Sequence, residues 1–393
     1  MRRFTILLTI FLLLSMSLIG ICVESFSIKR SFLEKDLDGL TRLPKLNLDD
    51  VVCNFQKKIR SFYMDKTDDG DGYWKFSFSP EDIELEDDAF HRADASNLSH
   101  FIEWWYFDAI FDNGYSAQAG VRIMSLFDHD FVIFSRLDIY KDSQLVSHNN
   151  RLHFFENFNA STSVPLVLIN QKEVMRGYID KDTGNWTYDI SFEMGGISAD
   201  LHFVGCTKGY KGVTSSGEWA VILPRADVTG KLFIEGEEIK VRGVGYHDHN
   251  WEVTAEAALN FGWYWGKINS NTYTIVWSDI LTTWYLDQPL LVINENNDGY
   301  QNIEKDDIHF TVGDLRLTNW MIVPHSFSIV VHTENFSLDV EMQTLDIHYN
   351  PIMGSIMNYW RYHMRCTGFI IVGSRTELID DVVIAEFLRF RPY

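Results

Sequence analysis

Cysteine and proline are scarce in this sequence. Among 393 residues there are 4 cysteines and 8 prolines, and no two cysteines form a CxxC pair. Zinc sites of the knuckle type need clustered cysteines, so the sequence excludes this class. Beyond the N-terminal segment the cysteines are Cys53, Cys206 and Cys366. Their wide spacing fits one disulfide with one free thiol, and it fits an all-thiol core equally well.

Positive charge is scarce as well, because the formal net charge is −21. A nucleic-acid-binding protein needs a basic surface, so we expect no nucleic-acid partner. The sequence also lacks the G-x-S-x-G turn that presents a nucleophilic serine. It lacks as well the glycine-rich loop with a lysine that binds phosphate. Ser215, Ser216 and Gly217 are more simply a turn. Nucleophilic catalysis and nucleotide binding therefore have little support.

The N-terminus has the pattern of an export signal. Arg2 and Arg3 precede an apolar run from Phe4 to Val23. We expect residues 1–25 to be a signal peptide or, since the run has the roughly 20 residues that a bilayer span needs, an N-terminal membrane anchor. The protein is then extracytoplasmic, secreted or anchored, with membrane contact through this segment only.

The rest of the chain predicts an all-β protein with few short helices. An acidic, irregular segment covers 26–72. From residue 73 onward, short runs of β-branched and aromatic residues alternate with turn signals. The pieces of 33–63 and the short segment 254–259 are the best helical candidates. The length of the chain favours two domains, for which we predict the boundaries 73–228 and 229–393.

An internal repeat supports two antiparallel β-barrels. The segment 103–108, reading EWWYFD, is followed by an Asn-Gly turn, and the segment 263–266, reading WYWG, is followed by a second turn. Each aromatic cluster is predicted to open one barrel. Barrels of about eight strands can enclose one apolar ligand, so a long apolar small molecule is the expected partner.

The densest group of titratable and aromatic residues is 243–251, GVGYHDHNW. Side chains alternate between the two faces of a strand. Tyr246 and Asp248 are therefore predicted to share one face with Asn250, and His247 and His249 the other with Trp251. Only one of these two faces can line a ligand cavity.

Three motifs together resemble the carotenoid 1,2-hydratase and AttH-like family: 103–108, 223–226 with Gly230, and 243–251 with 263–266. The resemblance covers about residue 73 to the C-terminus and implies two lipocalin-like barrels in tandem. It also implies binding of an isoprenoid, carotenoid-like or lipid ligand, and acid-initiated hydration or cyclisation without metal or organic cofactor. Hydratases proper tend to carry a histidine beside the tryptophan of the second aromatic motif, whereas this chain has Trp263, Tyr264 and Trp265, which places it nearer the AttH-like branch.

Acid chemistry on an alkene requires a carboxylic acid with a raised pKa and aromatic faces beside the developing cation. Asp248 is the first candidate acid, with His247 or His249 orienting water or returning the proton. Asp279 and Glu103 are the second and third candidates. The predicted ligand-binding residues are the aromatic and amide side chains of the motifs, namely Trp104, Trp105, Tyr106, Tyr246, Asn250, Trp251, Trp263 and Trp265.

Two other interpretations remain open from the residues alone. The His247, Asp248 and His249 side chains can form a hydrogen-bonded junction that orients the domains without any turnover. A non-catalytic lipid carrier or envelope protein of the same fold fits that arrangement. His247 and His249 also have the His-x-His spacing of metal ligands, but no nearby cysteine or glutamate completes a tetrahedral site, so we expect no metal.

Overall fold

The computed structural model describes residues 78–91, 101–127, 130–214, 217–254, 262–281, 287–295, 299–319, 321–352 and 357–389. Within these ranges the chain forms 23 β-strands and only three 3-10 helices, η2 (Leu85–Asp88), η3 (Phe155–Asn157) and η4 (Lys305–Asp307). The predicted all-β class is confirmed. The predicted segments 1–25 and 26–72 lie outside the described residues, as do the candidate helices except Thr254, which ends a strand.

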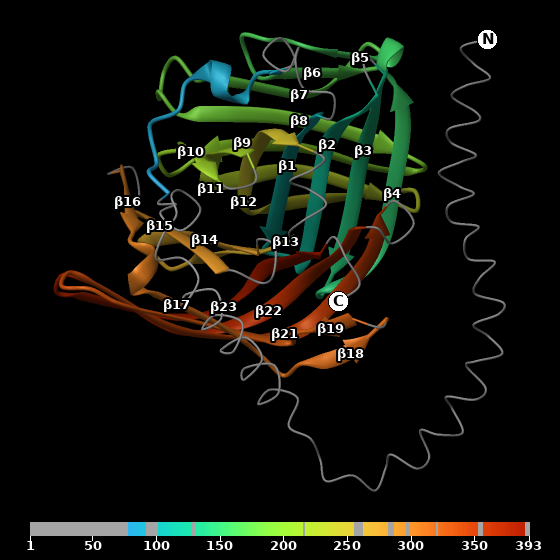
Figure 1. Cartoon of the computed structure of the whole chain (residues 1–393). Coiled ribbons are helices and arrows are strands. Elements are labelled where there is room, and N and C mark those ends of the chain that lie inside the picture. Colours follow the sequence, from blue (N-terminus) through green and yellow to red (C-terminus); the bar gives the residue numbers. More distant parts are fainter. Residues whose placement is uncertain are drawn as a thin grey trace, which may run out of the picture.

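The first sheet has 12 antiparallel strands and curls nearly into a barrel (Figure 1). Its order is β4-β3-β2-β1-β12-β11-β9-β8-β7-β6-β5, with β10 paired to β11. The strands are β1 (Phe101–Phe111), β2 (Tyr115–Phe127), β3 (Asp130–Lys141), β4 (Gln144–Phe154), β5 (Phe158–Ala160), β6 (Leu166–Ile169), β7 (Lys172–Ile179), β8 (Trp186–Met194), β9 (Ile197–Gly205), β10 (Tyr210–Thr214), β11 (Gly217–Ile234) and β12 (Glu237–Thr254).

The second sheet has 9 antiparallel strands in the order β16-β15-β14-β13-β23-β22-β21-β20-β17 and forms a half-barrel beside the first (Figure 1). A separate hairpin pairs β18 with β19. The strands are β13 (Gly262–Asn269), β14 (Tyr273–Leu281), β15 (Asp287–Glu295), β16 (Gly299–Ile303), β17 (Ile308–Gly313), β18 (Arg316–Thr318), β19 (Met321–Val323), β20 (Ser326–His332), β21 (Phe336–Ile352), β22 (Met357–Val372) and β23 (Arg375–Arg389).

The two sheets share one topological scheme, which explains the internal repeat. In the first sheet, the opening strand β1 pairs with the closing strand β12. In the second sheet, β13 pairs in the same way with β23. The aromatic motifs 103–108 and 263–266 occupy β1 and β13. Each motif therefore opens one sheet, as predicted.

The change from one sheet to the other falls between Thr254 and Gly262, not at the expected boundary of 228/229. Position 228 lies inside β11, an unbroken strand of 18 residues that pairs with β9 and β12. Gly230 lies within this strand and lets it approach its neighbour closely, because a Cβ there would lie 2.1 Å from the carbonyl oxygen of Asp200. The motif 243–251 consequently lies on the last strand of the first sheet.

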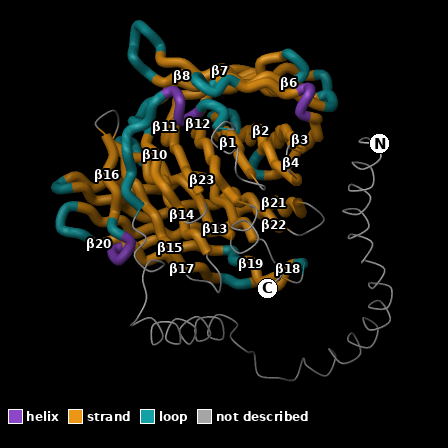
Figure 2. Tube along the Cα trace, turned by 45° about the horizontal axis from the view of Figure 1, so that its top comes forward, coloured by secondary structure: helices purple, strands orange, loops and turns teal. Residues whose placement is uncertain are grey.

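Side-chain alternation divides the interior into three apolar layers. Trp105, Phe107 and Phe203 belong to the core inside the first sheet. A second core, which includes Trp277 and Trp360, fills the inner face of the second sheet. Between the sheets, side chains from both pack together in a third layer, and Figure 2 shows the second sheet lying directly against the first. The burial of these faces is what holds the two sheets together.

Candidate active site between the two sheets

Strand β12 has no solvent-facing side over the motif 243–251, because each of its faces meets a different layer. Tyr246 belongs to the layer between the sheets, whereas Trp251 belongs to the core of the first sheet. Tyr246, His247 and His249 are each 0% exposed, and Asp248 is 6% exposed. The predicted division into two faces is what the structure shows, with Asp248 on the inter-sheet face.

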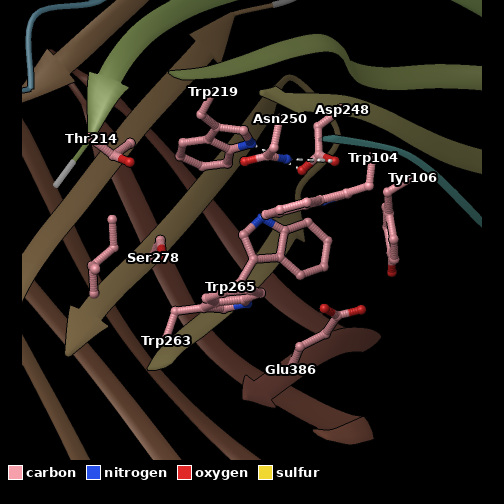
Figure 3. Close-up of a pocket in the computed structure, with 11 residues that line it drawn as sticks. Trp104, Tyr106, Thr214, Trp219, Asp248, Asn250, Trp263, Trp265, Ser278 and Glu386 are labelled. Carbon is pink, nitrogen blue, oxygen red and sulfur yellow. Dashed lines mark hydrogen bonds between the residues drawn. The ribbon is translucent and has the colours of Figure 1, made fainter. Parts of the chain in front are cut away.

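A pocket of about 60 Å³ lies between the sheets on the Asp248 side of β12 (Figure 3). Five strands of the two sheets that meet there, β1, β11, β12, β13 and β14, supply most of its walls. The lining residues are Trp104, Tyr106, Thr214, Trp219, Asp248, Asn250, Trp263, Trp265, Ser278, Ile280 and Glu386. Of the predicted site residues, the structure thus gathers Asp248, Asn250, Trp104, Tyr106, Trp263 and Trp265 around one space.

The Asp248 carboxyl group is held by three hydrogen-bond donors. Its Oδ2 accepts from the indole Nε1 of Trp219 at 3.0 Å and from the hydroxyl of Tyr246 at 2.8 Å. Its Oδ1 lies 3.5 Å from the amide nitrogen of Asn250. Burial raises the pKa of Asp248 to about 7, although the donors from Trp219 and Tyr246 act in the opposite direction. A large fraction of the molecules therefore carries a protonated Asp248 near neutral pH.

Aromatic rings form the pocket wall next to this acid. The indoles of Trp104 and Trp263 are stacked with their centroids 6.0 Å apart and their planes 11° apart. Trp265 packs against Tyr246 at 4.9 Å and against Tyr106 at 5.6 Å. The π faces of such rings attract positive charge. The pocket thus combines a proton donor with an environment that favours a cation.

Glu386 faces the same aromatic group from the second sheet (Figure 3). It accepts hydrogen bonds from the Tyr359 hydroxyl at 2.5 Å and from Arg361 Nη1 at 3.3 Å. Burial raises the pKa of Glu386, against the effect of Arg361. Sequence analysis missed this residue, although a lone carboxylate in the apolar run 383–388 was a usable signal. Trp219, the other missed pocket residue of chemical interest, lies in no motif.

Beneath the pocket, charged side chains join the two sheets. Lys267 donates to Asp108, and Arg361 Nη1 donates to the Tyr106 hydroxyl at 2.5 Å. Tyr106 in turn donates to Asp108 Oδ2 at 2.9 Å. Burial lowers the pKa of Lys267, while Asp108 opposes this shift. Because these groups are buried and mutually paired, they fix the relative position of β1 and the second sheet.

The opposite face of β12 carries a buried network centred on Asp88, the last residue of η2. Asp88 Oδ2 accepts from the Tyr188 hydroxyl at 2.7 Å and lies 3.0 Å from His247 Nε2. Its other oxygen lies 3.4 Å from His249 Nδ1. The His247 ring stacks on Phe107 with the ring centroids 3.8 Å apart. Both of its ring nitrogens contact oxygen atoms, because Nδ1 also donates to the Tyr106 carbonyl at 2.9 Å.

His249 and Glu103 form the second half of this network. His249 Nδ1 donates to the Asp87 carbonyl at 3.0 Å, and its Nε2 lies 2.9 Å from Glu103 Oε1. Burial lowers the pKa of His249 to about 4 and raises the pKa of Glu103 well above its usual value. The arrangement that agrees with both shifts has a neutral His249 ring, whose Nε2 accepts a hydrogen bond from the neutral carboxyl group of Glu103.

The predicted residues His247, His249, Glu103, Trp105 and Trp251 therefore lie on the core side of β12 and β1, away from the Asp248 pocket. Trp105 stacks on His249 at 4.6 Å and donates its Nε1 to the Asp88 carbonyl at 3.1 Å. All ring nitrogens of the two histidines contact protein oxygens. The His-x-His pair is thus engaged by Asp88, Glu103 and two backbone carbonyls.

Asp279, the second candidate acid, lies on β14 and is 4% exposed. Its neighbours Ser278 and Ile280 line the pocket, so alternation directs Asp279 to the inner face of the second sheet. Tyr246 is not among the lining residues, and it contacts the site through its hydrogen bond to Asp248. The structure consequently brings one of the three candidate acids, Asp248, into the pocket.

A larger cavity of about 480 Å³ lies elsewhere, beside the β18–β19 hairpin and β21. Charged and polar side chains such as Asp314, Arg316 and Gln343 contribute to its wall, together with Trp360. It contains none of the predicted site residues. Cys206 and Cys366 are both free thiols, and Cys53 lies outside the described residues. In the part of the chain that the structure describes, no helix has the length and apolarity to cross a membrane.

Two curled antiparallel sheets in tandem, with a pocket between them, define the class of tandem lipocalin-like proteins. The crystal structure of a protein assigned as AttH from Nitrosomonas europaea is similar in fold. It matches with a TM-score of 0.56 and 14% identity, over 79% of this chain and 98% of that one. The chain therefore has the AttH-like fold.

Two proteins are similar to parts of the sequence. The chain is 25% identical over 202 residues to the hydroxyneurosporene dehydrogenase of Chlorobaculum tepidum, which covers 49% of this chain and 49% of the relative. It is 34% identical over 73 residues to the quinolone epoxide rearrangement protein penF of Penicillium thymicola, which covers 19% of this chain and 20% of that relative. The matches span about half and a fifth of these two proteins. No family model matches the sequence. Fold and relatives together confirm the resemblance to the carotenoid 1,2-hydratase and AttH-like family.

Proposed function

We propose that the protein binds the end of an apolar, isoprenoid-like or lipid-like molecule in the inter-sheet pocket and transforms it by acid catalysis. The observation that carries this proposal is a buried carboxyl, Asp248, with a pKa of about 7 beside stacked indoles. A group that ionises near neutrality is an efficient proton donor. The relatives, named for a hydroxyneurosporene and for an epoxide rearrangement, support an apolar small molecule as substrate.

In the proposed reaction, Asp248 transfers its proton to an alkene carbon or an epoxide oxygen. Positive charge then develops at the adjacent carbon, between the faces of Trp104, Trp263 and Trp265. Water, or an internal nucleophile in a cyclisation, adds to this carbon. The proton lost from the added group returns to the Asp248 carboxylate, which restores the starting state.

The small volume of the pocket sets a limit on the substrate. About 60 Å³ holds a terminal group and not the whole of a long chain. Trp104, Asn250 and Trp263 lie only a few residues from the ends of β1, β12 and β13. A longer ligand would therefore extend from the pocket past these strand ends.

The test is incubation of the purified chain with candidate terpenoid alkenes and epoxides in heavy-oxygen water. Hydration is expected to place one heavy oxygen in the product, and cyclisation to give an isomer without label. Asp248→Asn should lower the rate by about 10²–10⁴-fold. Asp279→Asn is the matched control, because that carboxyl lies on the opposite face of its strand. Turnover that survives Asp248→Asn unchanged would remove Asp248 from the mechanism.

A non-catalytic lipid carrier is the second candidate. It is favoured by the bonds from Trp219 and Tyr246, which tie Asp248 to β11 and β12 in the manner of a structural link. A carrier would yield an extractable apolar ligand that is returned chemically unchanged, whichever residue stands at position 248.

We also propose that residues 1–25 direct export from the cytoplasm, on the basis of Arg2 and Arg3 followed by the apolar run. A reporter fused after residue 25 is expected to reach the extracytoplasmic side. An equal yield of cytoplasmic reporter with and without residues 1–25 would contradict export.

A further inference from the structure

A second polar cluster joins the two sheets outside the pocket. It consists of Asp138 on β3, His148 on β4 and His348 on β21. One potential ligand atom from each side chain lies within 4.8 Å of the other two. Among the residues that the structure describes, this is the one group of three histidine, cysteine or acidic side chains that converges in this way. None of the three lines the Asp248 pocket.

The two oxygens of Asp138 have different surroundings. Oδ2 accepts from Arg136 Nε at 2.7 Å, from Arg136 Nη2, and from the Tyr140 hydroxyl at 3.4 Å. Oδ1 faces only the Nδ1 of His148, at 2.5 Å. Asp138 is 0% exposed, so these contacts fix its orientation. One oxygen is therefore held by donors from its own strand while the other contacts His148.

We propose that Asp138, His148 and His348 bind a divalent transition-metal ion of the Zn²⁺ type, which links the first sheet to the second. Two imidazoles and one carboxylate are the protein donors of many three-ligand zinc sites, where water completes the coordination. The side chain of His148 is 35% exposed, which gives the ion and its water access from solvent. The imidazoles disfavour Mg²⁺ and Ca²⁺, which prefer oxygen ligands.

Arg136 fits this site as an outer partner. Carboxylates that bind a metal through one oxygen commonly accept hydrogen bonds at the other, and this fixes their direction. Arg136 also places its guanidinium over the ring of Tyr359 at 5.0 Å. The hydroxyl of Tyr359 donates to Glu386 in the pocket. The metal site and the pocket are therefore connected by a short chain of contacts through the second sheet.

The experiment uses the purified full chain after treatment with a chelator. Thermal unfolding is measured with added Zn²⁺, Mg²⁺ or Ca²⁺, and visible absorption is measured with Co²⁺. At a hundredfold excess of Zn²⁺ over its Kd, Tm should rise by about 3–4 °C, and Co²⁺ should give the bands of a tetrahedral site. Mg²⁺ and Ca²⁺ should give no shift.

His148→Ala and His348→Ala should each abolish the Co²⁺ bands and the Zn²⁺-dependent rise in Tm. His153→Ala is the matched control, since His153 lies on β4 and contacts Ser135 outside the cluster. The Tm of each metal-free variant shows whether it is folded. The proposal is overturned if the original chain gives no bands and no shift, or if both persist in the two cluster variants, because the ion then binds at other histidines.

Discussion

The two faces of β12 differ in enclosure more than in composition. On the core face, His247 and His249 are 0% exposed, stacked on aromatic rings, and bonded at both nitrogens. On the inter-sheet face, Asp248 has comparable aromatic neighbours and a pocket in front of it. Both faces perturb titratable groups, and the pocket of about 60 Å³ lies on the second. A dense cluster of polar and aromatic residues therefore does not by itself locate a reactive site.

The largest expected effect is on the core face. Asp88→Ala removes the partner of His247, Tyr188 and His249 and leaves buried polar groups unpaired. The free energy of unfolding, measured by urea denaturation, should fall by about 3–5 kcal/mol. Asp87→Ala should cost less, about 1–2 kcal/mol, because the Asp87 side chain accepts one capping bond from the Glu84 backbone N–H at 2.7 Å and pairs with the partly exposed Lys211. Equal losses in the two variants would contradict the central role of Asp88.

The next largest effect is expected on the inter-sheet face, in the dependence of stability on pH. The pKa of Asp248 is about 7 when folded against an ordinary 3.8, so the folded state keeps a proton that the unfolded chain has lost. This contribution is fully present below about pH 4 and is lost as the pH rises to about 7. From pH 5 to pH 8, Asp248→Asn should gain on the order of 2–3 kcal/mol relative to the original chain. A constant difference across this range would mean that Asp248 is already ionised at pH 5.

A third comparison concerns the aromatic wall. Trp263→Ala removes one half of the stacked indole pair, and the residue is half-buried. We expect a stability loss of about 2 kcal/mol and a weaker affinity for the pocket ligand, by about tenfold or more. Trp186→Ala, at a half-buried tryptophan that packs against the first core, should cost similar stability and leave affinity unchanged. Loss of affinity in both variants would indicate a general effect of destabilisation.

The smallest effect is expected at Glu103. Because its pKa is raised and it donates to His249 Nε2, the amide of Glu103→Gln can make the same bond, although it cannot accept the 3.2 Å bond that Oε1 takes from the His91 backbone N–H. Stability should change by less than about 1 kcal/mol, while Glu103→Met, which has no donor, should lose about 1–3 kcal/mol. Chemical denaturation of both variants at pH 7 measures the difference. A large loss in Glu103→Gln would show that Glu103 is charged.

The sequence allowed the all-β class, the opening strands of both sheets and the division of β12 into two faces to be predicted, because each depends on local alternation. It did not show which face borders a pocket, because that depends on β13, β14 and β23 of the other sheet. Asp88 belongs to an acidic stretch that has the composition of a surface turn, yet it is 0% exposed. Its partners His247 and Tyr188 lie 159 and 100 residues away. Contacts of such range leave no local pattern.

The two-sided burial of β12 constrains how this chain can vary. A shift of one residue in its pairing would turn Asp248 toward the first core and His249 toward the second sheet. The hydrogen bonds on both faces of the strand would then be lost together. Single-residue insertions or deletions between Tyr246 and Trp251 should therefore be rejected in a mutational library, even where individual substitutions survive. Single-residue insertions in the hairpin turn at Glu235 and Gly236, which joins β11 to β12, should be tolerated because the turn can lengthen without a change in pairing. The pairing register of strand β12 thus determines which side chains face each of the two layers that pack against it.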